Sequence, residues 1–221
     1  MWAPLQCDLK GDYMQESQQE LQGELYFYRL LSQIFSVEPS AELLQQIGGI
    51  EPLNRTDEVL RGIRQMVDSV KRNAGRIEEY QEELSVEFAR LFLGPIKPVA
   101  IPYASYYLSE SRLLNTEETL EVRRKYLESG MAIKELFSVP DDHIGIELEF
   151  LCYLTSEIIC AQEVGDQERV RALKIARDEF ANGHFLRWVP VFADRLVTDS
   201  GGDEFFKGAA LLLRGVINPV S

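Results

Sequence analysis

The stretch Ile77-Glu-Glu-Tyr-Gln-Glu-Glu-Leu-Ser-Val-Glu-Phe-Ala-Arg-Leu91 decides the fold class of this chain. Its large apolar side chains recur every three or four residues, at Ile77, Tyr80, Leu84, Phe88 and Leu91. Four glutamates lie between the first three of them, so the pattern predicts a helix with one apolar stripe and one acidic face. Such a stripe has to be buried against other elements, and the rest of the sequence supplies further helices.

Helical periodicity also extends to both sides of this stretch. Apolar residues repeat at the same spacing within residues 21–35 and 60–70. On the other side, Asn115 followed by Glu118 is typical of a capping box, and we expect it to open a helix that runs to Gly130.

The run from His143 to Glu163 carries apolar residues almost all the way round a helix, so it predicts a central, buried one. Two more helical segments follow, at about residues 166–184 and 204–217. No stretch alternates apolar and polar residues between hairpin turns, so we predict an all-α fold, a single globular helical domain of roughly eight to eleven helices. We expect residues 1–15 to form an N-terminal extension and residues 16–221 to form the helical domain.

Composition limits the function as well as the fold. The 221 residues are 45% apolar, enough for one ordinary core, and 36 acidic against 23 basic side chains give a formal charge of -13. This charge argues against a nucleic-acid partner and suits a cationic one. The three cysteines, Cys7, Cys152 and Cys160, indicate reduced thiols in the cytoplasm. No leader and no apolar run of about 18 residues is visible, so we expect neither export nor membrane insertion.

The sequence lacks the motifs of the common enzyme classes. Neither G-x-x-x-x-G-K-[ST] nor G-x-G-x-x-G occurs, so no phosphate cradle is expected. The chain has two histidines, His143 and His184, and neither G-x-S-x-G nor H-E-x-x-H. We therefore expect no catalytic residues, no bound metal and no cofactor.

Two segments carry unusual chemistry. The first, residues 95–107, contains three prolines, which predict a semi-rigid extended arm whose apolar side chains either fill gaps between helices or line a groove for an apolar peptide. The second begins Pro140-Asp141-Asp142-His143 and continues to Glu147. Its two aspartates are typical of the start of a helix. His143 and Glu147 lie one turn apart on the same face, so the segment also suits a binding site for a basic peptide or, as a second choice, for a metal.

Taken together, these segments resemble the TorD/DmsD/NarJ family of cytoplasmic redox-enzyme (molybdoenzyme) maturation chaperones. The resemblance covers about residues 80–190 and rests on the following motifs: Glu87-Phe88-x-x-Leu91-Phe92-x-Gly94-Pro95, Pro102-Tyr103-x-Ser105-x-Tyr107, Tyr126 with Gly130, Pro140-Asp141-Asp142-His143 running into Glu147-Leu148-Glu149-Phe150, and His184-Phe-Leu-Arg-Trp188.

The resemblance implies a TorD-like helical chaperone without catalysis of its own. Its partners would be the apo catalytic subunit of a molybdopterin oxidoreductase and the twin-arginine signal peptide of that precursor, which the chaperone holds while cofactor is inserted and export is delayed. It would be a monomer or a homodimer. The peptide-binding residues predicted in this way are Leu91, Phe92, Pro102, Tyr103, Ser105, Tyr107, Asp142, His143 and Glu147. On this hypothesis, replacing Asp142 and His143 by alanine weakens peptide binding without lowering the melting temperature.

An alternative stays open from the residues alone. Asp142, His143, Glu147 and His184 also suit a small all-helical metal-dependent hydrolase, although such enzymes usually contain more histidines. Metal analysis of the purified protein separates the two hypotheses.

Overall fold

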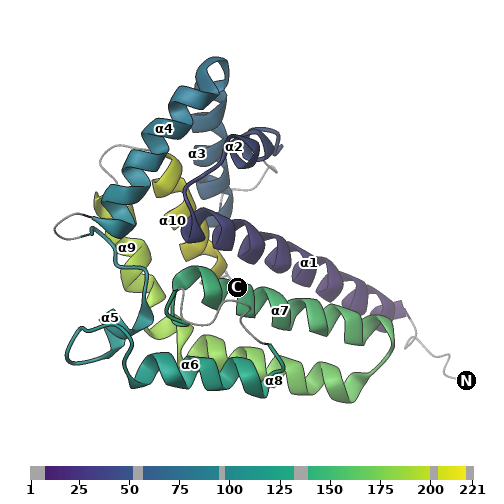
Figure 1. The fold of residues 1–221 in the computed structure, drawn as a ribbon. Coiled ribbons are helices and arrows are strands. Elements are labelled where there is room, and N and C mark those ends of the chain that lie inside the picture. The colour runs from purple at the N-terminus through teal and green to yellow at the C-terminus, as the bar shows by residue number, and fades with distance from the viewer. Residues whose placement is uncertain (1–7, 52–56, 95–97, 132–138, 200–203, 218–221) are drawn as a thin grey trace, which may run out of the picture.

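The structure is a computed structural model that describes residues 8–51, 57–94, 98–131, 139–199 and 204–217, with side chains from residue 18 onward. These ranges hold ten α-helices and no strand, so the all-α prediction is confirmed (Figure 1). The helices are α1 (Asp8–Ser36), α2 (Ala41–Gly48), α3 (Glu58–Arg72), α4 (Ile77–Phe88), α5 (Ala104–Leu108), α6 (Glu117–Glu128), α7 (Ile144–Glu163), α8 (Gln167–Gly183), α9 (Val189–Asp199) and α10 (Glu204–Ile217).

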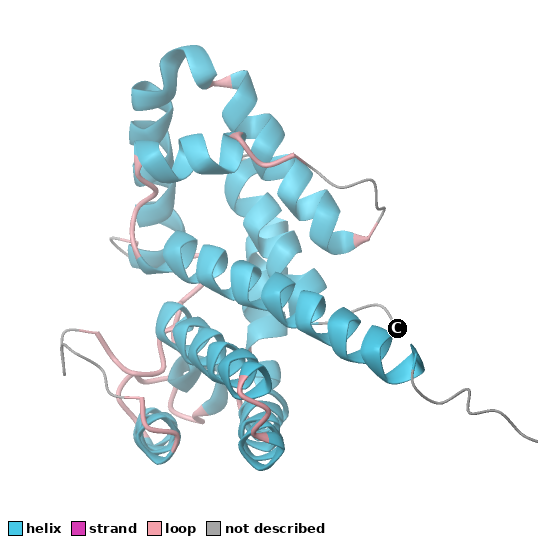
Figure 2. Cartoon of the chain, turned by 90° about the vertical axis from the view of Figure 1, so that its right-hand side faces the viewer, coloured by secondary structure: helices cyan, strands magenta, loops and turns pink. Residues whose placement is uncertain are grey.

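The long helix α1 crosses the middle of the molecule and separates two groups of helices. In Figure 1, α2, α3 and α4 stand above it, and α6, α7 and α8 lie below it. The turned view in Figure 2 keeps this arrangement. Helix α10 packs on α3 and α9, while α7 packs on both α1 and α8. The helix predicted to be central, now α7, thus lies between two others, with buried residues on most of its surface.

The helices do not show where the predicted N-terminal extension ends and the helical domain begins. Helix α1 begins at Asp8 and continues through residue 16, so the predicted division between an extension and a domain falls within one helix. That division therefore stays a prediction. No helix among the described residues is long and apolar enough to cross a membrane.

Local corrections concern the beginnings and ends of helices. The cap at Asn115 was predicted one residue too early, because Thr116 is the N-cap of α6 and Asn115 has a positive φ of 57°. The Thr116 hydroxyl donates to the Glu118 carboxylate and makes no capping hydrogen bond to the backbone, so the predicted capping box is absent. The helix ends at Glu128, and Gly130 follows in the left-handed region at a φ of 82°.

Three helices were missed in the sequence, namely α2, α5 and α9. The predicted extended arm ends in α5, which includes Tyr107, because no proline follows Pro102 and Ala104–Leu108 is free to coil. Helix α9 carries Pro190 in its first turn, where a missing N–H costs nothing.

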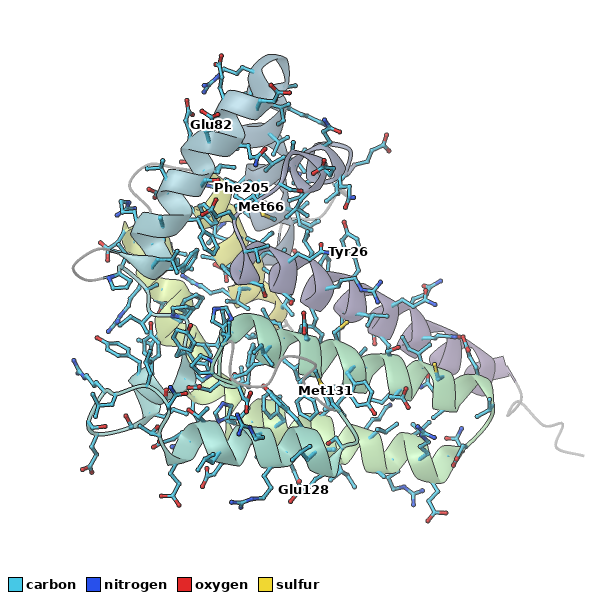
Figure 3. All side chains as sticks on the ribbon, viewed as in Figure 1. Tyr26, Met66, Glu82, Glu128, Met131 and Phe205 are labelled. Atoms are coloured by element: carbon cyan, nitrogen blue, oxygen red, sulfur yellow. The ribbon has the colours of Figure 1, made fainter. Side chains whose placement is uncertain are left out.

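Close backbone contact joins α3 to α10 and fixes the upper group of helices. A Cβ atom added to Gly62 of α3 would lie 2.5 Å from the carbonyl oxygen of Gly208 and would also meet the backbone of Leu212. Met66 and Phe205 fill the interior around this contact, whereas Glu82 and Glu128 lie on outer faces of the molecule (Figure 3). Glycine at position 62 is therefore required by the spacing of the two helices.

We predict that Gly62→Ala lowers the free energy of unfolding by roughly 1–3 kcal/mol, because the new methyl group meets backbone and cannot be relieved by a side-chain rotation. Urea denaturation followed by circular dichroism measures the change. The matched control is Gly23→Ala on α1, where an added Cβ meets nothing within 4 Å. Higher helix propensity should make that variant about 0.5–1 kcal/mol more stable. Equal stability of the two variants would contradict the account of the α3–α10 contact.

Candidate functional site

The described part of the arm, residues 98–103, bends at Val99 and Ala100, is extended at Tyr103 and has two different faces. From residue 99 to residue 104, the even-numbered residues are buried and the odd-numbered ones are half-buried. This alternation is the geometry of an extended chain, in which successive side chains point to opposite sides. The arm therefore fills a gap between helices with one face and offers apolar side chains to solvent with the other.

An antiparallel bridge between Tyr103 and His143 joins the arm to the beginning of α7. Two backbone hydrogen bonds flank this pair: Ala104 N–H donates to Asp142 O at 3.0 Å, and Ile144 N–H donates to Pro102 O at 2.9 Å. The two rings meet edge to face, with centroids 5.0 Å apart. We call this arrangement the Tyr103–His143 clasp. It brings together the two segments that the sequence singled out separately.

Asp142 fastens the clasp from within. Its carboxylate is fully buried and accepts hydrogen bonds from the Ser105 backbone N–H at 2.7 Å and from the Thr119 hydroxyl at 2.9 Å. The Ser105 N–H belongs to the opening turn of α5, where it has no acceptor within the helix. Asp142 therefore caps α5 across the clasp, whereas the sequence suggested that it caps its own helix.

His143 is the residue that caps α7. Its Nδ1 accepts a hydrogen bond from the Gly145 N–H at 3.1 Å. Burial lowers the pKa of His143 to about 4, although the neighbouring Asp142 carboxylate opposes this shift. The imidazole is therefore neutral near pH 7, as an accepting nitrogen requires.

Asp141 fixes the same segment to α6. Its carboxylate pairs with the Arg123 guanidinium, and its backbone oxygen accepts a hydrogen bond from the Tyr126 hydroxyl at 3.0 Å. Arg123, Thr119 and Trp188 were not predicted as functional residues. No motif marks Arg123 or Thr119, which the sequence shows only as positions on a predicted helix.

Glu147 joins α7 to the segment that precedes α9. One carboxylate oxygen lies 2.7 Å from His184 Nε2, and the other accepts a hydrogen bond from Trp188 Nε1–H at 3.0 Å. Burial raises the pKa of the Glu147 carboxyl, while His184 and Trp188 oppose that increase. Removing this carboxylate would leave two buried ring N–H groups without their acceptor.

Tyr107 extends this network to the surface. Its ring stacks on Trp188 with centroids 5.4 Å apart, and the Arg195 guanidinium lies 5.1 Å from the ring centroid. Burial raises the pKa of Tyr107 to about 12, while Arg195 opposes the shift. The ring is half-buried, so Tyr107 belongs both to the packing and to the outer face of α5.

The predicted peptide-binding residues are thus close together but differ in exposure. The half-buried members are Tyr103 and Tyr107, and the buried ones are Leu91, Phe92, Pro102, Ser105, Asp142, His143 and Glu147. Leu91 and Phe92 end up in the core because a π-helical turn, Ala89–Leu93, follows α4 and directs both inward. Phe92 contacts the rings of Phe35 and Phe192 there.

The four residues proposed for a metal-dependent hydrolase are held by other partners. Asp142 binds Ser105 and Thr119, and His143 directs Nδ1 to backbone. Glu147 and His184 bind each other. Nowhere in the described ranges do three or more His, Cys, Asp or Glu side chains form a group suited to a metal ion. The donor arrangement gives this alternative no support.

We predict that His143→Asn makes stability less dependent on pH. The folded-state pKa of about 4 lies below the ordinary value of 6.5, so the stability that neutral His143 contributes is complete above pH 6.5. It is lost as the pH falls toward 4, by at most roughly 3 kcal/mol. Asparagine caps a helix equally well and does not titrate in this range. Urea denaturation at pH 7.5, 6 and 5 should show wild type losing more stability than the variant.

Glu147 also contributes to the pH dependence of stability. Both proteins contain it, so its contribution cancels when the variant is compared with wild type. Parallel curves of stability against pH would contradict the assignment of His143 as a neutral cap.

We also predict that Asp142→Ala lowers the free energy of unfolding by roughly 3 kcal/mol, because the buried Ser105 N–H and Thr119 hydroxyl lose their acceptor. Asp142→Asn should cost less, since its amide can accept from Ser105 and donate to Thr119. Thermal melting of both variants measures this order. It differs from the expectation drawn from sequence, in which this aspartate is dispensable for folding. An unchanged melting temperature for Asp142→Ala would restore the earlier expectation.

Comparison with known proteins agrees with this architecture. The family model described as nitrate reductase delta subunit matches residues 54–194. The chain is 35% identical to the chaperone protein TorD of Aliivibrio fischeri, over 78% of this chain and 80% of that protein. It is 34% identical to the chaperone protein TorD of Photobacterium profundum, over 69% of this chain and 67% of that protein.

These relatives are chaperones, which agrees with the expectation of a protein without catalysis of its own. The family match includes the arm, the clasp and Trp188. The chain therefore belongs to the nitrate reductase delta subunit family, together with the TorD chaperone proteins.

Proposed function

We propose that this protein is a system-specific chaperone for the catalytic subunit of a molybdopterin oxidoreductase. It holds the apo subunit in the cytoplasm until cofactor is inserted, and it binds the twin-arginine signal peptide so that export is delayed. Membership of the family and the chaperone relatives support the general role. The half-exposed apolar face of the arm supports the binding of a peptide.

The observation that carries this proposal is the position of Tyr103. Its ring is half-buried, next to His143, on the face of the arm that points away from the core. Tyr106 and Tyr107 continue this apolar surface onto α5. An aromatic side chain held in place loses little conformational entropy when it binds, which makes it a strong contact for the apolar part of a signal peptide.

The buried residues of the predicted site have a supporting role in this proposal. Asp142, His143 and Glu147 already bind protein partners, so they position the clasp and the aromatic surface rather than lie open to the peptide. A formal charge of -13 attracts the cationic end of a signal peptide over a longer range. The arginine pair then needs carboxylates on the exposed surface of the chain.

We predict that Tyr103→Ala weakens the binding of a twin-arginine signal peptide at least roughly tenfold, because a central aromatic contact is lost. Isothermal titration calorimetry with a synthetic peptide, Arg-Arg followed by an apolar run, measures the affinity. Tyr26→Ala is the matched control, since Tyr26 is 49% exposed on α1 and belongs neither to the arm nor to the clasp. Its affinity should equal that of wild type.

Melting curves of both variants establish that the fold is retained. If wild type binds no such peptide, or if Tyr103→Ala binds it as tightly as wild type does, the proposed binding surface is wrong.

A further inference from the structure

Arg195 of α9 lies against two tyrosines of α5. Its guanidinium carbon is 5.1 Å from the centroid of the Tyr107 ring and 5.8 Å from the centroid of the Tyr106 ring. Both distances are within the range of a cation–π interaction. Successive side chains on a helix point about 100° apart, so a group that contacts both rings lies between them. The half-buried Arg195 therefore bridges the two rings that continue the proposed peptide surface.

No carboxylate of the described residues lies within ion-pair distance of Arg195. The two acids of α9 interact with other arginines instead. Asp194 pairs with Arg214 at 3.1 Å, and the backbone oxygen of Asp199 accepts a hydrogen bond from Arg90 at 2.9 Å. The Arg195 guanidinium is therefore free to interact with the tyrosine rings.

Helix α5 depends on such contacts because it is short. A helix of five residues is not stable through its own hydrogen bonds. Asp142 caps its first turn, and the stacking of Tyr107 on Trp188 holds its end. Trp188 directly precedes α9 and lies about two helical turns before Arg195. Trp188 and Arg195 therefore connect α5 to α9 at two points.

We propose that Arg195 is a positioning residue for the peptide-binding surface, because it holds the rings of Tyr106 and Tyr107 in the orientation that extends this surface from Tyr103 onto α5. The inference rests on the proposed function, since it assigns Arg195 a role in the same site. Arg195 acts through the rings and makes no contact of its own with the peptide. Its two effects on a cationic peptide have opposite signs: its charge repels the peptide, whereas its support of the rings strengthens binding.

The first test measures the affinity for the twin-arginine peptide by isothermal titration calorimetry. Arg195→Ala should weaken binding roughly threefold or more, although the loss of a positive charge alone would strengthen it. Arg195→Lys keeps a cation within reach of the rings, so it should bind more tightly than Arg195→Ala. Arg171→Ala is the matched control, because Arg171 is exposed on α8 and its replacement changes the formal charge equally. The control should bind at least as tightly as wild type.

A double-mutant cycle separates support of the rings from direct contact with the peptide. In a background that carries both Tyr106→Leu and Tyr107→Leu, no ring remains for Arg195 to position. Adding Arg195→Ala to this background should therefore change the affinity less than roughly twofold. A loss as large as in the wild-type background would mean that Arg195 contacts the peptide itself, and the proposal would be wrong.

The second test does not require the peptide. Trp188 is fully buried and stacks on Tyr107, and replacing Trp2 by phenylalanine leaves Trp188 as the only tryptophan of the chain. Arg195→Ala should raise the acrylamide quenching constant of Trp188 at least roughly twofold, because the Tyr107 ring is held less firmly against it. Arg171→Ala should leave the quenching constant unchanged.

Unchanged quenching in Arg195→Ala, or a peptide affinity equal to that of wild type, overturns the proposal. Melting curves establish that the variants fold. If wild type binds no twin-arginine peptide, the proposed function is wrong, and the quenching constant still decides whether Arg195 holds Tyr107 in place.

Discussion

The Tyr103–His143 clasp is the constraint on which the rest of the site depends. Two backbone hydrogen bonds hold a proline-containing arm against the start of α7, and the side chains of Asp142 and His143 then cap one helix each. A residue that caps a helix in another segment fixes the relative position of both. Without the clasp, neither α5 nor the aromatic surface around Tyr103 would have a defined position.

Burial explains why these polar residues serve structure first. A carboxylate withdrawn from water loses several kcal/mol of solvation, which only well-placed donors offset. Asp142 and Glu147 each have two such donors, so little of their hydrogen-bonding capacity is left for a ligand. The same contacts make the network sensitive to the loss of any single partner.

The sequence predicted the helical class and the central α7 because both depend on periodicity, which is local. It also identified the arm and the Pro140–Glu147 segment, since prolines and clustered acids are visible without a structure. It did not predict exposure. Whether Leu91 or Asp142 faces solvent depends on a π-helical turn and on contacts with α6, which lie far away in sequence. Spacing alone likewise placed the cap of α6 on Asn115, whereas the N-cap is Thr116, one residue later, and its side chain makes no capping hydrogen bond.

The arm fills a gap between helices with one face, and on the proposed function its other face binds the peptide. Its buried face, which includes Pro102, is fixed by the packing around it, so its residues have little freedom to differ with the client. Its outer face, which includes Tyr103, is only half-buried, so it accepts other side chains at a smaller cost. On the proposed function, affinity for a client is set on the outer face, while the buried face and the clasp set where that surface lies. A rigid support of this kind lets one fold present different binding surfaces without repacking its core.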